Sequence, residues 1–521
     1  MADARVHERS TGVASAITGA VVLGLGGHAT LALWSATSEV GGDVRTLATV
    51  LLAVAGLQLL RAVRARAFSL ALACFWAWSF VFLGLAPAHQ LAAGVFPWLG
   101  RFEDAVVVRA QVVVLVGHAA VLVGTRLAGR RPAPATARRT RVPGRPRRAS
   151  TSVGRPRRLT TVDRRSLVMR RLVLAQVLVS VTFAGLMGPS ALLSGRVAFR
   201  EQLLLVSTLP GGGTLYFLAT ASAIVVPAMA VAGRRLGLRL PGLLLLISVT
   251  AGLAVTNPFI GSRFLTGSFL VAVAGAQLMG RSAARLLPVG TVLLLVTVFP
   301  SLDVLRGDGT GSDRVSALTP SEALRTFDFD AFEMLLRAVV VEQAPGQVVD
   351  PVMALAAPLL RWVPFVADSV MGGASGPLVA RATGMTYTNV SMPLWGEGYL
   401  VAGLTGTVLV LGLLGAWLGV NRRSVGVRDR LGAGLSVADA PSAALLFIVL
   451  RGSLYEVLGY LLFAVAMWVV LWRRGVVGGV EEPADAVEGL VPGLGRSAEV
   501  PDTVPLVPAG RVVGGGRDAN D

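Results

Sequence analysis

The sequence predicts an all-α fold, a polytopic membrane helix bundle of about twelve transmembrane helices with a large outer loop that contains short helices. Of the 521 residues, 54% are hydrophobic and 15% are charged, and the mean hydropathy of +0.67 indicates a chain solvated by lipid. The apolar residues form blocks close to the ~20 residues that a helix needs to cross a bilayer. Arginines gather in the links between these blocks.

Backbone amides in lipid find no partner outside their own segment, so the apolar blocks are expected to be helices rather than strands. The first block follows Arg5 and Arg9 and is interpreted as a retained helix rather than a signal peptide, because many more blocks follow. The shortest apolar block contains Pro441 near its start and ends before Arg451. The predicted transmembrane segments are 13–36, 45–61, 67–86, 105–126, 172–189, 213–232, 241–256, 263–280, 286–302, 399–420, 438–450 and 454–472.

These segments divide the chain into six regions. They are transmembrane helices 1 to 4 (1–125), an arginine-rich cytoplasmic loop (126–171), helices 5 to 9 (172–302), an extracytoplasmic loop (303–398), helices 10 to 12 (399–474) and a cytoplasmic tail (475–521). The arginine-rich loop and the tail lack the residues for a hydrophobic core and are predicted to be disordered.

The basic residues, all arginines, concentrate in every second link between segments. By the positive-inside rule, these links and both termini lie in the cytoplasm, and the expected location is the cytoplasmic membrane with a multi-pass topology. The net charge of +18 would suit nucleic acid, but its confinement to links indicates topology signals and no nucleic-acid partner. The loop 126–171 holds sixteen arginines and is expected to rest against anionic lipid, with a docking site for a cytoplasmic partner as the alternative.

The outer loop has the sequence features of a structured region. Residues 332–341 have a helical apolar pattern, and 352–370 are apolar but interrupted by Pro358 and Pro364, as expected for a helix in the membrane interface. A loop this long between membrane segments usually carries function, so the active site is expected beneath it.

Four arginines are expected on the outer side, three near the ends of segments and one within the proline-interrupted stretch 352–370. Guanidinium groups bind phosphate through two hydrogen bonds and are costly at membrane depth, so a shared anionic ligand is predicted for this set. The alternative is that each side chain reaches separately to the lipid headgroups. The four candidates are Arg263, Arg306, Arg361 and Arg451.

The candidate base is Glu397, at the point where the outer loop re-enters the membrane, and Asp303 is the second choice. A carboxylate at such a boundary is partly desolvated, which makes it a better proton acceptor. The alternative role for Glu397 is to cap the N-terminus of the tenth helix.

Other polar residues have simpler interpretations. Arg109, Gln111 and His118 in the fourth segment suggest a structural ion pair with nearby acids, with a substrate role as the alternative. Asp328 and Asp330 have a spacing that soluble glycosyltransferases use for a metal, but such tripeptides are common by chance. Gly415 and Gly419 are predicted to pack against another helix. The single cysteine, Cys74, and the absence of metal-ligand spacing predict no metal and no cofactor.

Three stretches carry a resemblance to a known family. They are Thr256-Asn257-Pro258 with Gly261-Ser262-Arg263-Phe264, the run from Phe299 to Arg306, and the run from Asn389 to Tyr399 followed by Gly403 and Gly406. With the large outer loop and the number of segments, this arrangement resembles the Wzy-type oligosaccharide repeat unit polymerases, the O-antigen polymerase family. The resemblance covers about 240–420.

The resemblance implies a metal-independent membrane glycosyltransferase. It would transfer a growing glycan from undecaprenyl diphosphate to the next lipid-linked repeat unit at the outer face of the membrane, in surface polysaccharide biosynthesis. Glu397 and Asp303 would be catalytic, and the four arginines with Asn257 and Tyr399 would bind substrate. A flippase and a chain-length regulator of the same pathway would be possible partners.

Three other functions remain open. A transporter or flippase of lipid-linked glycans would also have many segments, although such proteins commonly show two similar halves and no internal repeat is found here. An O-antigen ligase or a polyprenyl-phosphate-sugar enzyme is a second alternative, but the latter usually carries an acidic pair in its first outer loop. A scaffold that recruits partners through the basic loop would leave the outer arginines unexplained.

Overall fold

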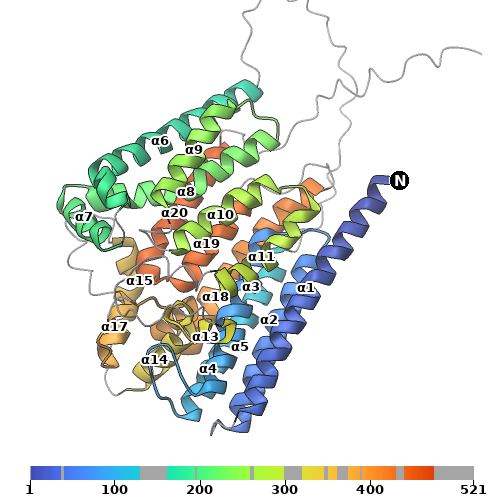
Figure 1. Ribbon diagram of the computed structural model, residues 1–521, viewed down its shortest axis with the longest axis vertical. Helices are drawn as coiled ribbons and strands as arrows, with labels where there is room; N and C mark the ends of the chain where they lie inside the picture. The colour runs from blue at the N-terminus through green and yellow to red at the C-terminus, as the bar shows by residue number, and fades with distance from the viewer. Residues whose placement is uncertain are drawn as a thin grey trace, which may run out of the picture. The chain divides into compact units, whose positions relative to one another are not determined.

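The described residues of each of the twelve predicted segments coincide largely with helix in the computed structural model (Figure 1), and 299–302 of the ninth lie outside the described part of the chain. The structure describes residues 2–36, 40–129, 161–193, 196–257, 263–298, 319–344, 350–360, 374–387, 390–429 and 439–473. These residues form helices and turns, with no strand among them, and they belong to one compact unit. The tail 475–521 lies outside the described residues.

The first half of the chain supplies ten α-helices and two short elements of other helical type. The helices are α1 (Ala2–Ser35), α2 (Gly42–Arg64), α3 (Leu70–Phe80), a π-helical turn (Val81–Leu85), α4 (Ala86–Ala93), α5 (Asp104–Gly129), α6 (Thr161–Leu193), α7 (Arg196–Thr208), α8 (Gly212–Arg235), α9 (Gly242–Val255), α10 (Arg263–Gln277) and a 3-10 turn (Ser282–Leu286).

The second half contains the shorter helices of the outer loop and three longer ones. They are α11 (Leu287–Leu293), a π-helical turn (Leu294–Val298), α13 (Pro320–Ala323), a 3-10 turn (Phe327–Phe329), α14 (Ala331–Gln343), α15 (Pro351–Leu360), α17 (Ser375–Ala382), α18 (Leu394–Asp429), α19 (Asp439–Arg451) and α20 (Leu454–Arg473).

Seven helices in the described part of the chain are long and apolar enough to cross a membrane, as expected of a multi-pass membrane protein. They are Thr11–Ser35, Gly42–Arg64, Leu70–Ala93, Asp104–Gly129, Arg165–Gly188, Gly212–Arg235 and Leu394–Arg422. Four further apolar helices are shorter, namely Gly242–Val255, Phe264–Gln277, Ser282–Val298 and Val457–Met467.

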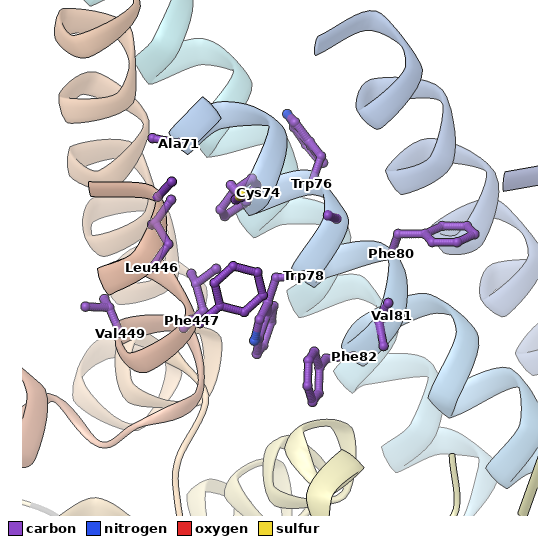
Figure 2. Close-up of a cluster of buried hydrophobic side chains, with 14 of the residues drawn as sticks. Ala71, Cys74, Trp76, Trp78, Phe80, Val81, Phe82, Leu446, Phe447 and Val449 are labelled. Atoms are coloured by element: carbon purple, nitrogen blue, oxygen red, sulfur yellow. The ribbon is translucent and has the colours of Figure 1, made fainter. Parts of the chain in front are cut away.

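Helix α3 is enclosed by protein along its whole length. Figure 2 shows Cys74 and Trp78 on the side of α3 that faces Phe447 of α19. Phe80 points to the opposite side, where its ring approaches the glycines of α1 and α2. Because every side of α3 is apolar, it can be packed on all faces, as a central helix of a bundle must be.

Helices α5 and α18 approach each other closely because glycines form their contact. A Cβ atom on Gly415 would collide with the carbonyl oxygen of Val121, and one on Gly124 with that of Gly412. Thr125 of α5 donates a hydrogen bond from Oγ1 to Gly415 O at 3.1 Å. The predicted packing role of Gly415 is therefore confirmed, and Gly419 likewise lies against Thr125.

The structure differs from the expected segments in the length of some helices. The third predicted segment ends before Pro87, but the helix continues to Ala93 and ends at Gly94, whose φ is 64°. A π-helical turn precedes Pro87, which lacks a backbone N–H and would otherwise collide with the preceding turn.

The arginine-rich link is shorter than predicted. Helix α5 continues to Gly129 and α6 begins at Thr161, so both ends of the 126–171 loop are helical rather than disordered. Arginines can extend a membrane helix because their long side chains carry the charge away from the apolar part. Residues 130–160 lie outside the described part of the chain.

We call the side of the bundle where the short, arginine-bearing links join consecutive helices the basic end. Buried polar contacts join the helix ends on this side. Ser69 before α3 donates to Asp439 at the start of α19, with an Oγ to Oδ1 distance of 2.8 Å. Arg285 donates from Nη1 to Ala65 O at 3.0 Å, just after α2.

The opposite helix ends also contact one another, and we call this side the loop end. Gly41 N before α2 donates to Asp104 Oδ2 at the start of α5 (2.8 Å). Trp98 after α4 donates from Nε1 to Asp330 Oδ2 before α14 (3.0 Å). Along the described chain, helix ends therefore contact one another alternately at the basic end and at the loop end. This order is expected for a chain that crosses a membrane layer repeatedly.

Candidate functional site

Helix α18 begins with a short half-helix that folds back on the rest of α18. The backbone leaves helical geometry at Ala402 (φ −156°, ψ 38°) and Gly403 (φ 56°, ψ −141°). Gly398, before this break, lies against Thr407 after it, so close that a Cβ on Gly398 would be 2.8 Å from the Thr407 Cα. Residues nine apart in a continuous helix would be separated by more than two turns. The segment 394–401 is therefore a hairpin arm.

This arm is held in the protein interior by Trp395. Trp395 is fully buried, and its ring stacks on that of Trp78 with a centroid distance of 5.8 Å and an interplanar angle of 7°. Its edge meets Gly117 of α5, where there is no room for a Cβ. The predicted tenth segment, 399–420, thus begins within the arm and is not continuous.

Glu397, the predicted base, lies on the first turn of this arm and is only 4% exposed. Its Oε1 accepts a hydrogen bond from Ser375 Oγ at 2.5 Å and another from Leu454 N at 2.9 Å. Ser453 Oγ lies 3.2 Å from Ser375 Oγ. The carboxylate thus joins the first residues of α17 and α20.

Three helix N-termini converge on this carboxylate, since α17 begins at Ser375, α18 at Leu394 and α20 at Leu454. The partial positive charge of a helix N-terminus favours a negative charge beside it. Glu397 therefore accepts a hydrogen bond from a helix N-terminus, but from that of α20 rather than that of its own helix, which the capping alternative named.

Arg451 ends α19, three residues before the N–H that Glu397 accepts. Its Nη2 donates to Phe327 O at 3.0 Å and to Asp330 Oδ1 at 3.4 Å, and Nη1 lies 3.9 Å from Asp328 Oδ1. The guanidinium carbon lies 4.0 Å from the ring centroid of Phe264. Within the described part of the chain, Nε and Nη1 are buried and have no hydrogen-bond acceptor.

The hydrogen bonds of Arg451 in the described part of the chain are thus made by Nη2 alone. Its side chain is 13% exposed, and a buried guanidinium normally uses most of its five N–H donors. Nε and Nη1, which make no hydrogen bond within the described residues, are donors that could hold oxygens of an anionic ligand.

Asp330 lies in a cluster of buried charges that also fixes the loop after α4. Burial raises the pKa of Asp330 above its usual range, and burial likewise raises that of Glu333. Glu333 accepts from Trp98 N at 2.6 Å and forms an ion pair with Arg337 at 2.7 Å. These contacts fasten the outer-loop helix α14 to the bundle.

The remaining predicted substrate residues are distributed as follows. Arg263 is the first residue of α10, and the ring of the next residue, Phe264, contacts Arg451. Asn257 donates from Nδ2 to Leu192 O at 3.4 Å, at the end of α6. Tyr399 donates to Glu342 Oε2 at 3.3 Å, and Arg109 lies beside the same hydroxyl. Asp303, Arg306 and Arg361 lie outside the described residues.

The other polar residues of the fourth segment have packing partners. Gln111 donates from Nε2 to Val44 O at 3.0 Å. His118 is buried, with its ring perpendicular to that of Trp395 at a centroid distance of 5.6 Å. Asp104, an expected partner of Arg109, accepts from Gly41 N.

Sequence reasoning missed several residues of this region. Asp328 and Asp330 were interpreted as a chance tripeptide, but they are acids that contact Arg451. Ser375 and Ser453 carried no sequence signal beyond their place at helix starts, since Ser375 meets Glu397, and Ser453 meets Ser375, only through the fold. The signal that could have found Asp330 is an acidic residue between apolar ones at the start of a predicted helix.

In the described part of the chain, no group of three or more histidine, cysteine, aspartate or glutamate side chains has the arrangement of a metal site. Comparison with protein-family models, with curated proteins and with solved structures finds no match to this chain.

Proposed function

We propose that this protein polymerises undecaprenyl-diphosphate-linked oligosaccharide repeat units at the outer face of the cytoplasmic membrane, with the basic end in the cytoplasm. Two groups at the loop end carry the proposal: the buried carboxylate of Glu397, which accepts from Leu454 N, and the guanidinium of Arg451, three residues earlier, which retains unused donors. The resemblance of 240–420 to the O-antigen polymerases supports the same activity, because Glu397 and Arg263 both fall in its stretches.

The reaction needs two kinds of group. A hydroxyl of the acceptor sugar attacks the anomeric carbon of the donor glycan, the new glycosidic bond forms, and the bond from that carbon to the diphosphate oxygen breaks. Glu397 takes the hydroxyl proton, and the departing diphosphate keeps the bonding electrons. Arg451, with Arg263, stabilises the charge that develops on the diphosphate. Asp303, Arg306 and Arg361 remain candidates for the same two roles.

The topology of the proposal follows the distribution of arginines. The links of the basic end carry Arg64, Arg66, Arg235, Arg239 and Arg281, whereas Arg337 and Arg451 at the loop end form ion pairs with acids. Positive charge in short links favours the cytoplasmic side. Lipid-linked repeat units would then reach Glu397 from the outer leaflet.

The deciding experiment is gel analysis of surface glycan in a deletion strain complemented with variants. We expect the deletion to lose long chains and to accumulate single repeat units. Glu397→Gln keeps the shape and the acceptor oxygen but removes the base, so we expect a loss of at least about 100-fold in polymer. The matched control is Glu201→Gln on α7, an exposed carboxylate, which should polymerise normally.

Three results would contradict the proposal in different ways. Unchanged chain length in Glu397→Gln would remove Glu397 from the role of base. Absence of all surface units in the deletion strain, with units retained inside, would indicate a flippase. Long chains that accumulate on the lipid carrier without attachment to their final acceptor would indicate a ligase.

A further inference from the structure

A cavity of about 510 Å³ opens at the loop end, between the segment that follows α4 and the turn that follows α17. It is lined by Trp98, Leu99, Gly100, Arg101, Phe102, Arg337, Val340 and residues 382–387. None of these residues was a candidate in the sequence. The cavity combines aromatic rings, hydroxyl groups and guanidinium groups, which is the composition of a site for a small polar ligand.

The aromatic wall is built on Trp98. Its ring lies 4.3 Å from that of Phe327 and 5.4 Å from that of Tyr387, the latter nearly parallel at 17°. These ring contacts fix the orientations of Phe327 and Tyr387. Tyr387 nevertheless keeps 42% of its surface exposed, so an aromatic ring remains open to a ligand at the cavity.

The two walls are joined by a buried ion pair. Arg337 forms its ion pair with Glu333 and also donates from Nη1 to Thr383 Oγ1 at 3.1 Å. Glu333 in turn accepts from Trp98 N at 2.6 Å and from Gly100 N at 3.2 Å. The cavity is thus held open by the protein rather than formed by a ligand, which reduces the entropy lost on binding.

The positive charge available to a ligand comes from Arg101. Arg337 is neutralised by Glu333, whereas Arg101 is exposed and has no hydrogen bond or ion pair within the described part of the chain. Leu99, two residues earlier, has a φ of 56°, an unusual value for a residue with a Cβ. Such strain commonly occurs where a loop is shaped for binding.

The cavity is connected to the site around Glu397. Trp98 Nε1 donates to Asp330, which pairs with Arg451. Helix α14 separates the two places: Arg337 and Val340 face the cavity, while Ala338 lies against Gly396, beside Glu397. A helix is ~10 Å wide, so an extended ligand could reach both.

We propose that this cavity is a saccharide-binding site that takes sugars of the growing glycan away from the reacting bond, with an acidic substituent against Arg101. The C–H groups on the apolar face of a sugar ring would pack on Tyr387, and Thr383 and Thr386 would meet its hydroxyls. Arg101 would pair with a carboxylate or phosphate on the glycan. The identity of the ligand as growing glycan rests on the proposed function, but saccharide binding by the cavity can be tested separately.

The test is a binding titration with the full-length protein in lipid nanodiscs. The first probe is the oligosaccharide released by mild acid from lipid-linked units of the deletion strain. The second is a panel of neutral, uronic-acid and phosphorylated trisaccharides. We expect Tyr387→Ala and Arg101→Ala each to weaken binding by about tenfold or more, a change of ~1.4 kcal/mol. Tyr387→Phe keeps the ring and should bind like the parent protein.

Two further variants serve as controls. Arg381→Ala removes an exposed arginine of α17 that does not line the cavity, and should leave binding unchanged. Glu397→Gln should also bind the probe while losing polymerisation, which separates the cavity from the reaction. Thermal unfolding of each variant distinguishes loss of the cavity from loss of the fold.

Three results would overturn the saccharide site. The first is equal binding by the parent protein, Tyr387→Ala and Arg101→Ala. The second is no binding of either probe with a dissociation constant below ~1 mM. The third is displacement of a bound acidic saccharide only by anionic phospholipid, which would make the cavity a lipid-headgroup site. If the deletion strain accumulates no lipid-linked units, the proposed function fails, and the trisaccharide panel still decides whether the cavity binds saccharide.

Discussion

The basic end and the loop end both bury charged side chains, but they satisfy them differently. At the basic end, Asp439 is fully buried and accepts from Ser69 Oγ (2.8 Å), Leu70 N (2.7 Å) and Ala71 N (3.4 Å). It caps the first turn of α3 from another helix. At the loop end, the side chain of Arg451 is 13% exposed, yet two of its nitrogens are buried and have no acceptor within the described residues.

The difference separates charges that hold the fold from charges that can hold a ligand. A buried carboxylate with three donors has offset the cost of its desolvation within the protein, so nothing more need bind it. A guanidinium with unused donors has not offset the cost of its desolvation, and an anionic ligand would complete its hydrogen bonds. Burial by itself does not distinguish the two ends, whereas the count of donors and acceptors does.

The largest effect is expected at Arg451. Arg451→Met leaves Asp330 buried without its cation, which should cost about 3–5 kcal/mol of stability, and it should also abolish polymerisation. The double variant Arg451→Met with Asp330→Asn removes both charges and should recover much of the stability but none of the polymer. Thermal unfolding and gel analysis of surface glycan measure the two effects.

The matched variant at the basic end is Arg285→Met. Arg285 donates to the carbonyl oxygens of Val63 and Ala65, so its loss should lower stability while each folded molecule keeps its activity. Polymer made by the Arg451 double variant would show that this guanidinium does not hold the diphosphate. A loss of activity per folded molecule in Arg285→Met would show that a charge at the basic end also takes part in the reaction.

The helices were predictable because apolar blocks in lipid have few alternatives to helix. All twelve segments are found as helices, and the pattern of residues 332–341 correctly indicated α14. The count of about twelve membrane crossings stays a prediction, since seven of the helices have the length and composition to cross. The amphipathic helix α7 was not predicted; it lies in the link 190–212 between the fifth and sixth segments.

The site was less predictable, for reasons of distance along the chain. Glu397 and Arg451 were singled out because each lies at the end of an apolar block, a local signal. Their partners Ser375 and Asp330 come from the outer loop, and no periodicity connects residues so far apart. The hairpin at Ala402 was likewise invisible, because its sequence is as apolar as that of a continuous helix.

A smaller effect is expected from Asp439 at the basic end. Asp439→Asn places an amide N–H₂ where the backbone or Ser69 donates, so we expect a loss of about 1–3 kcal/mol in stability. Polymerisation per folded molecule should not change, because the residue lies at the opposite end from Glu397. The control is Asp43→Asn, an exposed acid in the first turn of α2, which should change stability by less than about 0.5 kcal/mol.

The smallest effect is a dependence of stability on pH at the loop end. Because burial raises the pKa of Asp330 and Glu333, the folded protein holds these protons more tightly than the unfolded chain does. Their contribution is therefore fully present below the unfolded pKa and is lost as the pH rises through the folded values. We expect the unfolding temperature of the parent protein to fall over that range relative to Asp330→Asn and Glu333→Gln.

Glu322 provides a control of opposite sign, since the Thr319 side chain lowers its pKa and its contribution is lost as the pH falls. A parent protein whose pH profile matches those of Asp330→Asn and Glu333→Gln would show that the two buried carboxyls bind their protons no more tightly in the folded state.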